Sequence, residues 1–311
     1  MNPKPMKPIK PKSFKRFSIC LLEICLAGLG LTGCAQFSQQ PIKPIVIGSK
    51  NFTEQLILAE LMAQTIEAKT DLKVERRFNL GGTFVCHQGL VSGQIDLYPE
   101  YTGTAYSAIL KQPIAKDAKQ VYERTQQIYR QRFSLEWTEP FGFENTFAIV
   151  VRGEDARRLN LKTLSDAAQH TPQWRAGFGY EFVERADGFP GLAKTYGLKF
   201  AEAPRTMDLG LIYRALTAKQ VDLVAGNSTD GVLSRLDLAI LKDDKQYFPP
   251  YQAAPIVRQA TLKKYPTLRQ ALRSLGSKIS ETEMQMLNDQ VDSQQQDITK
   301  VVQDFRRTKA L

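Results

Sequence analysis

Aromatic side chains with polar neighbours are the residues of this sequence that suggest a definite chemistry. They are Tyr98, Tyr101, Phe141, Phe143, Phe147, Tyr180, Tyr247, Phe248 and Tyr251. The face of an aromatic ring attracts a cation by roughly 0.5–2 kcal/mol per ring. Several rings together suit a quaternary ammonium group, because that group has no N–H with which to form hydrogen bonds. Core packing is the competing role, and we expect it for about two in three of these rings.

Catalytic chemistry finds little support in the sequence. The GxSxG, HExxH and GxxxxGK[ST] motifs are absent from it. It contains two histidines, His87 and His170, which excludes a histidine-rich metal site and disfavours a histidine-based triad. We therefore expect no catalytic residues, no metal site and no cofactor.

Composition and charge point to a soluble globular protein without a nucleic-acid partner. The chain has 311 residues, of which 42% are hydrophobic and 24% charged. This is enough chain to bury a sizeable core and to divide into two lobes. The formal net charge is +10, but residues 1–33 carry half of it. The remaining +5 is spread over residues 34–311 and is weak support for binding nucleic acid.

The N-terminal residues resemble a secretory signal. A lysine-rich run precedes the apolar stretch 17–30, which is followed by Leu31-Thr-Gly-Cys34. This ending resembles the bacterial lipoprotein box, which implies that residues 1–33 are removed and that Cys34 is lipidated. Residues 34–44 would then tether the protein to a membrane, with the protein on the side that faces away from the cytoplasm. Glu23 within the apolar stretch keeps an uncleaved hydrophobic anchor as the alternative.

The cysteines agree with this interpretation. Cys20 and Cys25 lie within the signal and Cys34 is the lipid acceptor, so the mature chain retains only Cys86. A single remaining thiol cannot form an internal disulfide. We expect Cys86 to be a buried structural residue rather than a catalytic partner of His87.

Alternating strands and helices are expected to position the aromatic residues. Ile45–Gly48 is an apolar run typical of a buried strand, and a helix over 52–69 follows, with Asn51 as its cap and Glu54 completing a capping box. A strand at 72–78, a helix at 84–92 and a strand at 94–97 continue this pattern, which restarts at 146–151 and includes a helix capped by Ser165. The alternation predicts α/β structure with parallel sheets. Three helices are expected near the C-terminus, over 266–275, 281–291 and 298–309.

An internal similarity suggests two lobes built on one plan. Residues 88–97 can be aligned with 214–223, each segment a helix end, a tight turn and a strand. A polar loop follows each strand, at 98–104 and at 224–230. Ligands of open α/β sheets lie beyond the carboxyl ends of the strands. Two such loops facing each other would line a cleft between the lobes.

Long motifs give the chain a family resemblance. They are Gly48-Ser-Lys-Asn-Phe-Thr-Glu-Gln55, Ile95-Asp-Leu-Tyr-Pro-Glu-Tyr-Thr-Gly-Thr104, Glu181-Phe-Val-Glu-Arg-Ala-Asp-Gly188, Tyr196-Gly-Leu198 and Asp243-Asp-Lys-Gln-Tyr-Phe-Pro-Pro-Tyr251. From about residue 45 to 305 the chain resembles the substrate-binding proteins of osmoprotectant ABC transporters, which bind glycine betaine, carnitine, choline or proline. The resemblance implies the two-lobed periplasmic-binding-protein fold of the second type, with the ligand cleft between the lobes. It places one lobe at 45–145 plus 250–311 and the other at 146–249.

The same resemblance implies a set of ligand-binding residues. Lys50, Thr104 and Arg185 match positions that hold the ligand carboxylate, for which an ammonium and a guanidinium are suitable partners. Rings that match walls of the cage for the trimethylammonium head stand at Tyr101, Phe147 and Tyr251, and Asn145 lines the same cage. A solvated charge near a turn is the competing role for Lys50 and Arg185.

Asn227 departs from the family pattern, which commonly has Tyr at this position. The internal alignment makes Asn227 the counterpart of Tyr101. A cage of four rings would thus become three rings and an amide. Loss of a ring contributing about 1 kcal/mol weakens binding roughly fivefold. Asn227 therefore predicts either weak betaine binding or a different ligand that an amide can hydrogen-bond.

The resemblance favours a non-enzymatic, monomeric, lipid-anchored receptor that delivers a quaternary-ammonium osmoprotectant to a membrane permease. A receptor for another amino-acid-like ligand is the first alternative, prompted by Asn227. An extracytoplasmic enzyme on the same scaffold is a second, since fold alone does not determine function. A sensor that reports the ligand to a membrane partner is the third.

Overall fold

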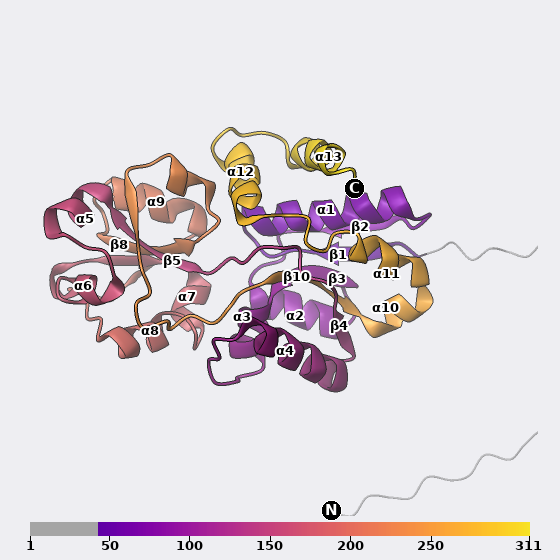
Figure 1. Ribbon diagram of the computed structural model, residues 1–311, viewed down its shortest axis with the longest axis horizontal. Coiled ribbons are helices and arrows are strands. Elements are labelled where there is room, and N and C mark those ends of the chain that lie inside the picture. Colours follow the sequence, from indigo (N-terminus) through magenta and orange to yellow (C-terminus); the bar gives the residue numbers. More distant parts are fainter. Residues whose placement is uncertain (1–42) are drawn as a thin grey trace, which may run out of the picture. The chain divides into compact units, whose positions relative to one another are not determined.

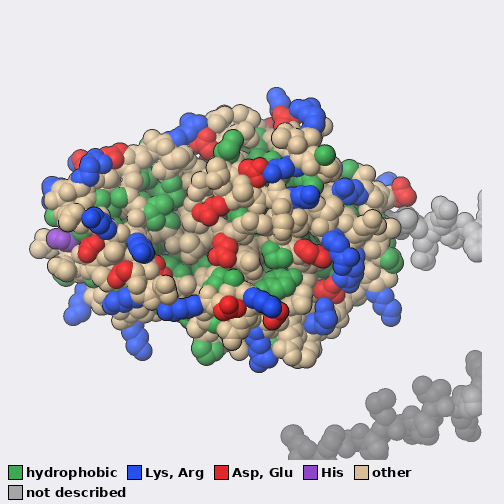
Figure 2. Space-filling model, viewed as in Figure 1, with side chains coloured by type: hydrophobic (Ala, Val, Ile, Leu, Met, Phe, Trp, Pro, Cys, Tyr) green, Lys and Arg blue, Asp and Glu red, His purple; other side chains and the backbone are tan. Residues whose placement is uncertain are grey.

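A computed structural model of the protein describes residues 43–311. The expected signal at 1–33, the expected lipidation at Cys34 and most of the 34–44 tether lie outside the described residues. Among residues 43–311, no helix is both long and apolar enough to cross a membrane. Acidic and basic side chains are interspersed over the face that Figure 2 shows.

The first sheet has five strands in the order β2-β1-β3-β10-β4. Its strands are β1 (Ile45–Gly48), β2 (Val74–Arg77), β3 (Leu97–Tyr101), β4 (Leu135–Trp137) and β10 (Ala253–Arg258). Strand β1 runs parallel to β2 and β3, whereas β10 is antiparallel to β3 and β4. The expected parallel sheet is therefore a mixed sheet, because β10 reaches it from elsewhere in the chain.

The second sheet repeats this plan in the order β7-β6-β8-β5-β9. Its strands are β5 (Phe147–Arg152), β6 (Ala176–Phe178), β7 (Arg205–Thr206), β8 (Leu223–Asn227) and β9 (Leu238–Leu241). Strand β6 is parallel to β7 and β8, and β5 is antiparallel to β8 and β9. The two sheets match strand for strand, with β3 equivalent to β8. This agrees with the shared plan suggested by the internal similarity.

Helices cover both faces of each sheet (Figure 1). The first lobe, meaning the first sheet and its helices, contains α1 (Thr53–Lys69), α2 (Thr83–Val91), α3 (Thr102–Thr104), α4 (Ala118–Phe133), α10 (Gln259–Lys264), α11 (Pro266–Arg273), α12 (Glu281–Asp292) and α13 (Ile298–Lys309). The second lobe contains α5 (Gly153–Leu159), α6 (Leu164–Ala168), α7 (Tyr180–Glu184), α8 (Phe189–Tyr196) and α9 (Leu209–Thr217). Four buried apolar clusters, one on each face of each sheet, form the cores.

Two segments of the chain cross between the lobes, 138–146 and 242–252. They pair with each other through an antiparallel bridge between Glu144 and Gln252. Each crossing ends in the strand that runs antiparallel to its neighbours, β5 or β10. The lobe boundaries at 145–146 and 249–250 fall within these crossings and stay a prediction.

Two expected helix caps are wrong. Helix α1 begins at Thr53 after Phe52, with no side-chain cap, and Glu54 turns into the interior instead of back toward the helix start. Helix α6 is capped by Thr163 in a capping box with Asp166, not by Ser165. In both cases several neighbouring residues have suitable side chains, and tertiary contacts decide which of them caps the helix.

The polar segment 98–104, which follows the first repeat, belongs to strand β3 and helix α3 and is not a loop. Tyr98 to Tyr101 belong to β3 and are buried. Their polar groups find partners inside the protein, so a stretch that reads as exposed is part of the sheet. The consequence for the site is that Tyr101 stands at the rigid end of a strand rather than on a mobile loop.

Candidate functional site

A pocket of about 450 Å³ lies between the two lobes, at the ends of β3 and β8. All eight residues predicted to bind the ligand line it: Lys50, Tyr101, Thr104, Asn145, Phe147, Arg185, Asn227 and Tyr251. Both lobes and both crossings contribute to this set. The pocket thus occupies the position expected for a ligand at the carboxyl ends of strands.

Aromatic rings form part of its wall. Phe147 meets Tyr251 edge to face, with ring centroids 5.9 Å apart, and Tyr101 comes from the opposite lobe to Phe147. A further ring, which the sequence analysis missed, is Phe52, stacked on Tyr101 at 6.4 Å. Phe52 belongs to the motif at residues 48–55, and its place in that motif could have indicated that it lines the pocket. Rings that face one pocket in this way can hold a cation against their π faces.

Two buried cations line the pocket, and both already have acidic partners. Lys50 Nζ lies 2.6 Å from Glu100 Oε1, and both side chains are almost fully buried. The Arg185 guanidinium donates two hydrogen bonds to Asp187, from Nε at 3.0 Å and from Nη2 at 2.6 Å. Burial alone would lower the pKa of Arg185, but attraction to Asp187 outweighs it and raises that pKa. The Arg185 guanidinium therefore stays charged.

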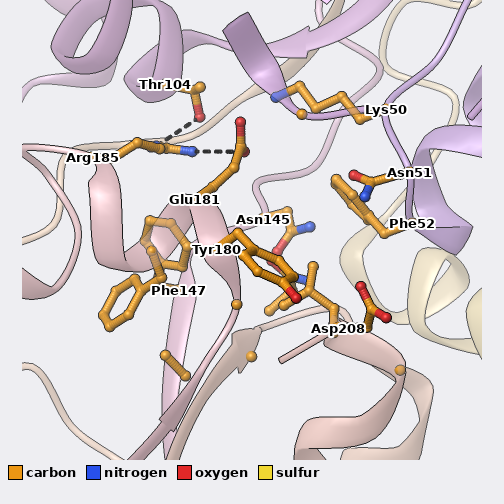
Figure 3. A pocket seen from close by; sticks show the side chains of 18 of the residues that line it. Lys50, Asn51, Phe52, Thr104, Asn145, Phe147, Tyr180, Glu181, Arg185 and Asp208 are labelled. Carbon is orange, nitrogen blue, oxygen red and sulfur yellow. Dashed lines mark hydrogen bonds and ion pairs between the residues drawn. The ribbon is translucent and has the colours of Figure 1, made fainter. Parts of the chain in front are cut away.

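Each cation retains donors that could meet a ligand carboxylate. A lysine ammonium has three hydrogens and an arginine guanidinium five. Within the described residues, Arg185 Nη1 donates no hydrogen bond and lies 3.7 Å from Glu181 Oε2. Thr104 accepts a bond of 3.1 Å from Arg185 Nη2, so its own hydroxyl hydrogen is still available. In Figure 3, Lys50 and Arg185 point toward each other, with Thr104 beside Arg185.

Amides form the polar part of the wall. Asn227 is the last residue of β8 and lies opposite Phe147 in the sheet. Its side-chain amide donates to Asp230 at 3.3 Å. Asn145 donates to Glu54 at 2.9 Å, and its Oδ1 is buried without a hydrogen-bond partner among the described residues. The pocket can therefore accept hydrogen bonds as well as hold a cation.

The carboxylate of Glu181 connects the lobes at the edge of the pocket. It accepts hydrogen bonds from the backbone N–H and the hydroxyl of Thr83, at the start of α2. A side chain at Gly82 would overlap with Glu181 Oε1, so this approach requires glycine there. Sequence reasoning missed Glu181 as a lining residue, although it opens one of the quoted motifs.

Comparison with known proteins identifies the family. Residues 43–308 match the family model described as the substrate-binding domain of ABC-type glycine betaine transport systems. The chain is 35% identical over 301 residues to the carnitine transport binding protein OpuCC of Listeria monocytogenes, covering 96% of each chain. It is 37% identical over 264 residues to the ergothioneine transport permease/ergothioneine binding protein EgtU of Helicobacter pylori. That match covers 85% of this chain but 47% of the relative, so the chain spans about half the length of EgtU.

Solved structures agree with the family assignment. A glycine betaine/carnitine/choline ABC transporter structure superposes with a TM-score of 0.71 at 33% identity, covering 86% of this chain and 98% of the other. This confirms the predicted α/β, two-lobed periplasmic-binding-protein fold. The chain belongs to the family of substrate-binding domains of ABC-type glycine betaine transport systems.

Proposed function

We propose that this protein captures a quaternary-ammonium osmoprotectant, of the glycine betaine, choline or carnitine type, in the pocket between its lobes and delivers it to an ABC permease. The observation that carries the proposal is the convergence of Tyr101, Phe147 and Tyr251 on the pocket that Lys50 and Arg185 also line. Rings and hydrogen-bond donors in one enclosed space match the two ends of a betaine.

The trimethylammonium head lies against the three rings in this proposal. Each ring contributes roughly 0.5–2 kcal/mol, the larger value applying when the cation is desolvated. The carboxylate of a betaine points to the remaining donors of Lys50, Thr104 and Arg185. A hydrogen bond to a charged group contributes about 1.5–3 kcal/mol. Choline would use the rings alone.

Closure of the lobes follows from contacts made across the pocket. Arg185 of the second lobe bonds to Thr104 of the first, and Glu181 of the second to Thr83 of the first. A ligand that touches both lobes favours the state in which these contacts form. The closed form is then the one presented to the permease.

A betaine with a larger side chain is a second candidate ligand. Ergothioneine carries a trimethylammonium group, a carboxylate and an imidazole-derived thione ring with N–H groups. The pocket extends beyond the rings to polar side chains at Asn51, Asn79, Asp208 and Asn227, which could accept from such donors. The relative EgtU, at 37% identity, is named for ergothioneine.

Calorimetric titration of the mature protein tests both candidates. Glycine betaine, choline, carnitine, proline and ergothioneine are titrated separately at one pH and salt concentration. Saturable binding of at least one of the first three supports the leading proposal. Markedly tighter binding of ergothioneine selects the second candidate, and no heat with any of the five compounds contradicts both.

The location of the protein completes the proposal. We infer a lipid anchor at Cys34, after removal of residues 1–33, that holds a monomer at the outer face of the cytoplasmic membrane or the inner face of an outer membrane. Metabolic labelling with palmitate is expected to mark the wild-type protein but not Cys34→Ser. Equal labelling of the two forms would contradict a lipid on Cys34.

A further inference from the structure

Glu54 is a buried acid that the proposed ligand contacts do not use. It is the second residue of α1 and is 2% exposed. Its carboxylate accepts four hydrogen bonds, which come from Tyr101 Oη at 2.6 Å, Asn145 Nδ2 at 2.9 Å, Thr229 Oγ1 at 2.5 Å and Asn288 Nδ2 at 3.4 Å. Four separate segments of both lobes therefore meet at this one side chain.

Two of these donors are also walls of the pocket. Tyr101 and Asn145 line it, and their polar groups point back to Glu54. Glu54 therefore stands directly behind the pocket, one side chain away from its interior. Thr229 belongs to the second lobe, so the full set of hydrogen bonds exists only while the lobes are together.

Glu54 differs from Glu100 and Asp187, two other buried acids beside the pocket, in having no cation beside it. Glu100 is paired with Lys50 and Asp187 with Arg185. Among residues 43–311, no lysine, arginine or histidine nitrogen lies within 4.0 Å of the Glu54 carboxylate, although Lys50 Nζ lies 5.0 Å from the centre of the Tyr101 ring. Burial raises the pKa of Glu54, whereas the four hydrogen bonds favour its charged form.

A buried carboxylate without a counter-ion is costly, and a cation placed nearby removes much of that cost. A charge in a buried site acts over several ångströms with little screening by water. A phenol that donates a hydrogen bond to a carboxylate also has a more electron-rich ring, which attracts a cation more strongly.

We propose that Glu54 supplies the counter-charge for the ligand's quaternary ammonium group, acting through Tyr101 and Asn145 and thereby setting the preference of the pocket for cations. This rests on the proposed function, because it requires a cationic ligand in the pocket. Glu54 is a positioning and specificity-determining residue in this account and does not touch the ligand.

Isosteres in which carbon replaces the quaternary nitrogen separate an effect of the ligand's positive charge from a structural one. The isostere of choline is 3,3-dimethylbutan-1-ol, and that of glycine betaine is 3,3-dimethylbutanoate. Each isostere has the shape of its parent with carbon in place of the charged nitrogen. Affinities for both pairs are measured by competition or calorimetry on wild-type protein and on Glu54→Gln.

Glu54→Gln is expected to weaken binding of choline or glycine betaine tenfold or more while changing the affinity for the matching isostere less than threefold. Tyr101→Phe keeps the ring but breaks its bond to Glu54, and it is expected to reduce the preference for the cation in the same direction. Glu54→Asp retains the charge and is expected to restore part of the preference. Glu60→Gln is the matched control, because Glu60 is also buried in α1 but pairs with Arg76, away from the pocket.

An equal loss of affinity for the cation and for its isostere, in both Glu54→Gln and Tyr101→Phe, would show a merely structural role and overturn the inference. An unchanged preference in both variants would also overturn it. If Glu54→Gln does not fold, Tyr101→Phe alone decides. Failure of the proposed function would give a different result, because wild-type protein would then bind neither choline nor glycine betaine. That result would also overturn the inference about Glu54.

Discussion

Substitution of Asn227 by tyrosine is expected to tighten binding of a simple trimethylammonium ligand about fivefold. Asn227 ends β8 directly opposite Phe147, and antiparallel neighbours point to the same face of a sheet. A ring at 227 would therefore stand beside Phe147 at the wall of the pocket. One additional ring contributes about 1 kcal/mol, which corresponds to about a fivefold change in Kd.

The substitution removes one side-chain hydrogen bond to a partly buried carboxylate. The side-chain bond from Asn227 to Asp230 is 3.3 Å long, and Asp230 keeps its bonds from the backbone N–H of Asn227 and from Tyr213. A hydrogen bond to a charged group contributes about 1.5–3 kcal/mol, and the length of 3.3 Å places this bond at or below the lower end of that range. Its loss lowers the free energy of unfolding, whereas the added ring acts on the affinity for the ligand.

Calorimetry with glycine betaine and choline measures this change, and thermal unfolding verifies that the variant is folded. Asn227→Leu is the control, because leucine adds apolar surface without a ring quadrupole. An unchanged or weaker affinity in folded Asn227→Tyr, or an equal gain in Asn227→Leu, would refute the cation–ring reasoning. For ergothioneine the expected result is weaker binding, since the tyrosine removes an amide and occupies space.

Two further predictions concern Arg185 and His87. Arg185→Lys keeps a cation beside the buried Asp187 but removes the Nη1 donor. It is expected to weaken the binding of glycine betaine and carnitine about tenfold and that of choline less than twofold. Equal losses of affinity for all three ligands in calorimetry would contradict the role of Arg185 in holding the carboxylate. Burial, with a smaller contribution from Arg132, lowers the pKa of His87 to about 4 from an ordinary value of 6.5. Between these values the unfolded chain binds a proton that the folded chain does not, so this contribution to stability is complete above pH 6.5 and falls as the pH drops toward 4. His87→Gln is expected to flatten the fall in Tm over this range, and an identical pH profile would count against the role of His87.

Sequence reasoning located the elements and the residues that line the pocket better than it located the partners of those residues. The strand at Ile45–Gly48 and the helix over 52–69 follow from local pattern, and the structure has a strand at Ile45–Gly48 and a helix at Thr53–Lys69. The eight candidate residues came from motifs of the family, which record where side chains meet a ligand, and all eight line one pocket.

What the sequence could not show is how the charges are matched. Lys50 and Glu100 are fifty residues apart, and Glu54 meets Thr229 and Asn288 from distant segments. Such pairings depend on the tertiary fold and leave no periodic signal in a single chain. For the same reason Glu54 was assigned to a capping box, a local role that its residue type and spacing suggested.

A crystal structure of the mature protein with glycine betaine or choline would show which side chains hold each end of the ligand. We expect the trimethylammonium group to contact Tyr101, Phe147 and Tyr251, and a betaine carboxylate to lie within hydrogen-bond distance of Lys50, Thr104 or Arg185. A ligand found outside this pocket, or one whose trimethylammonium group contacts none of these rings, would contradict this expectation.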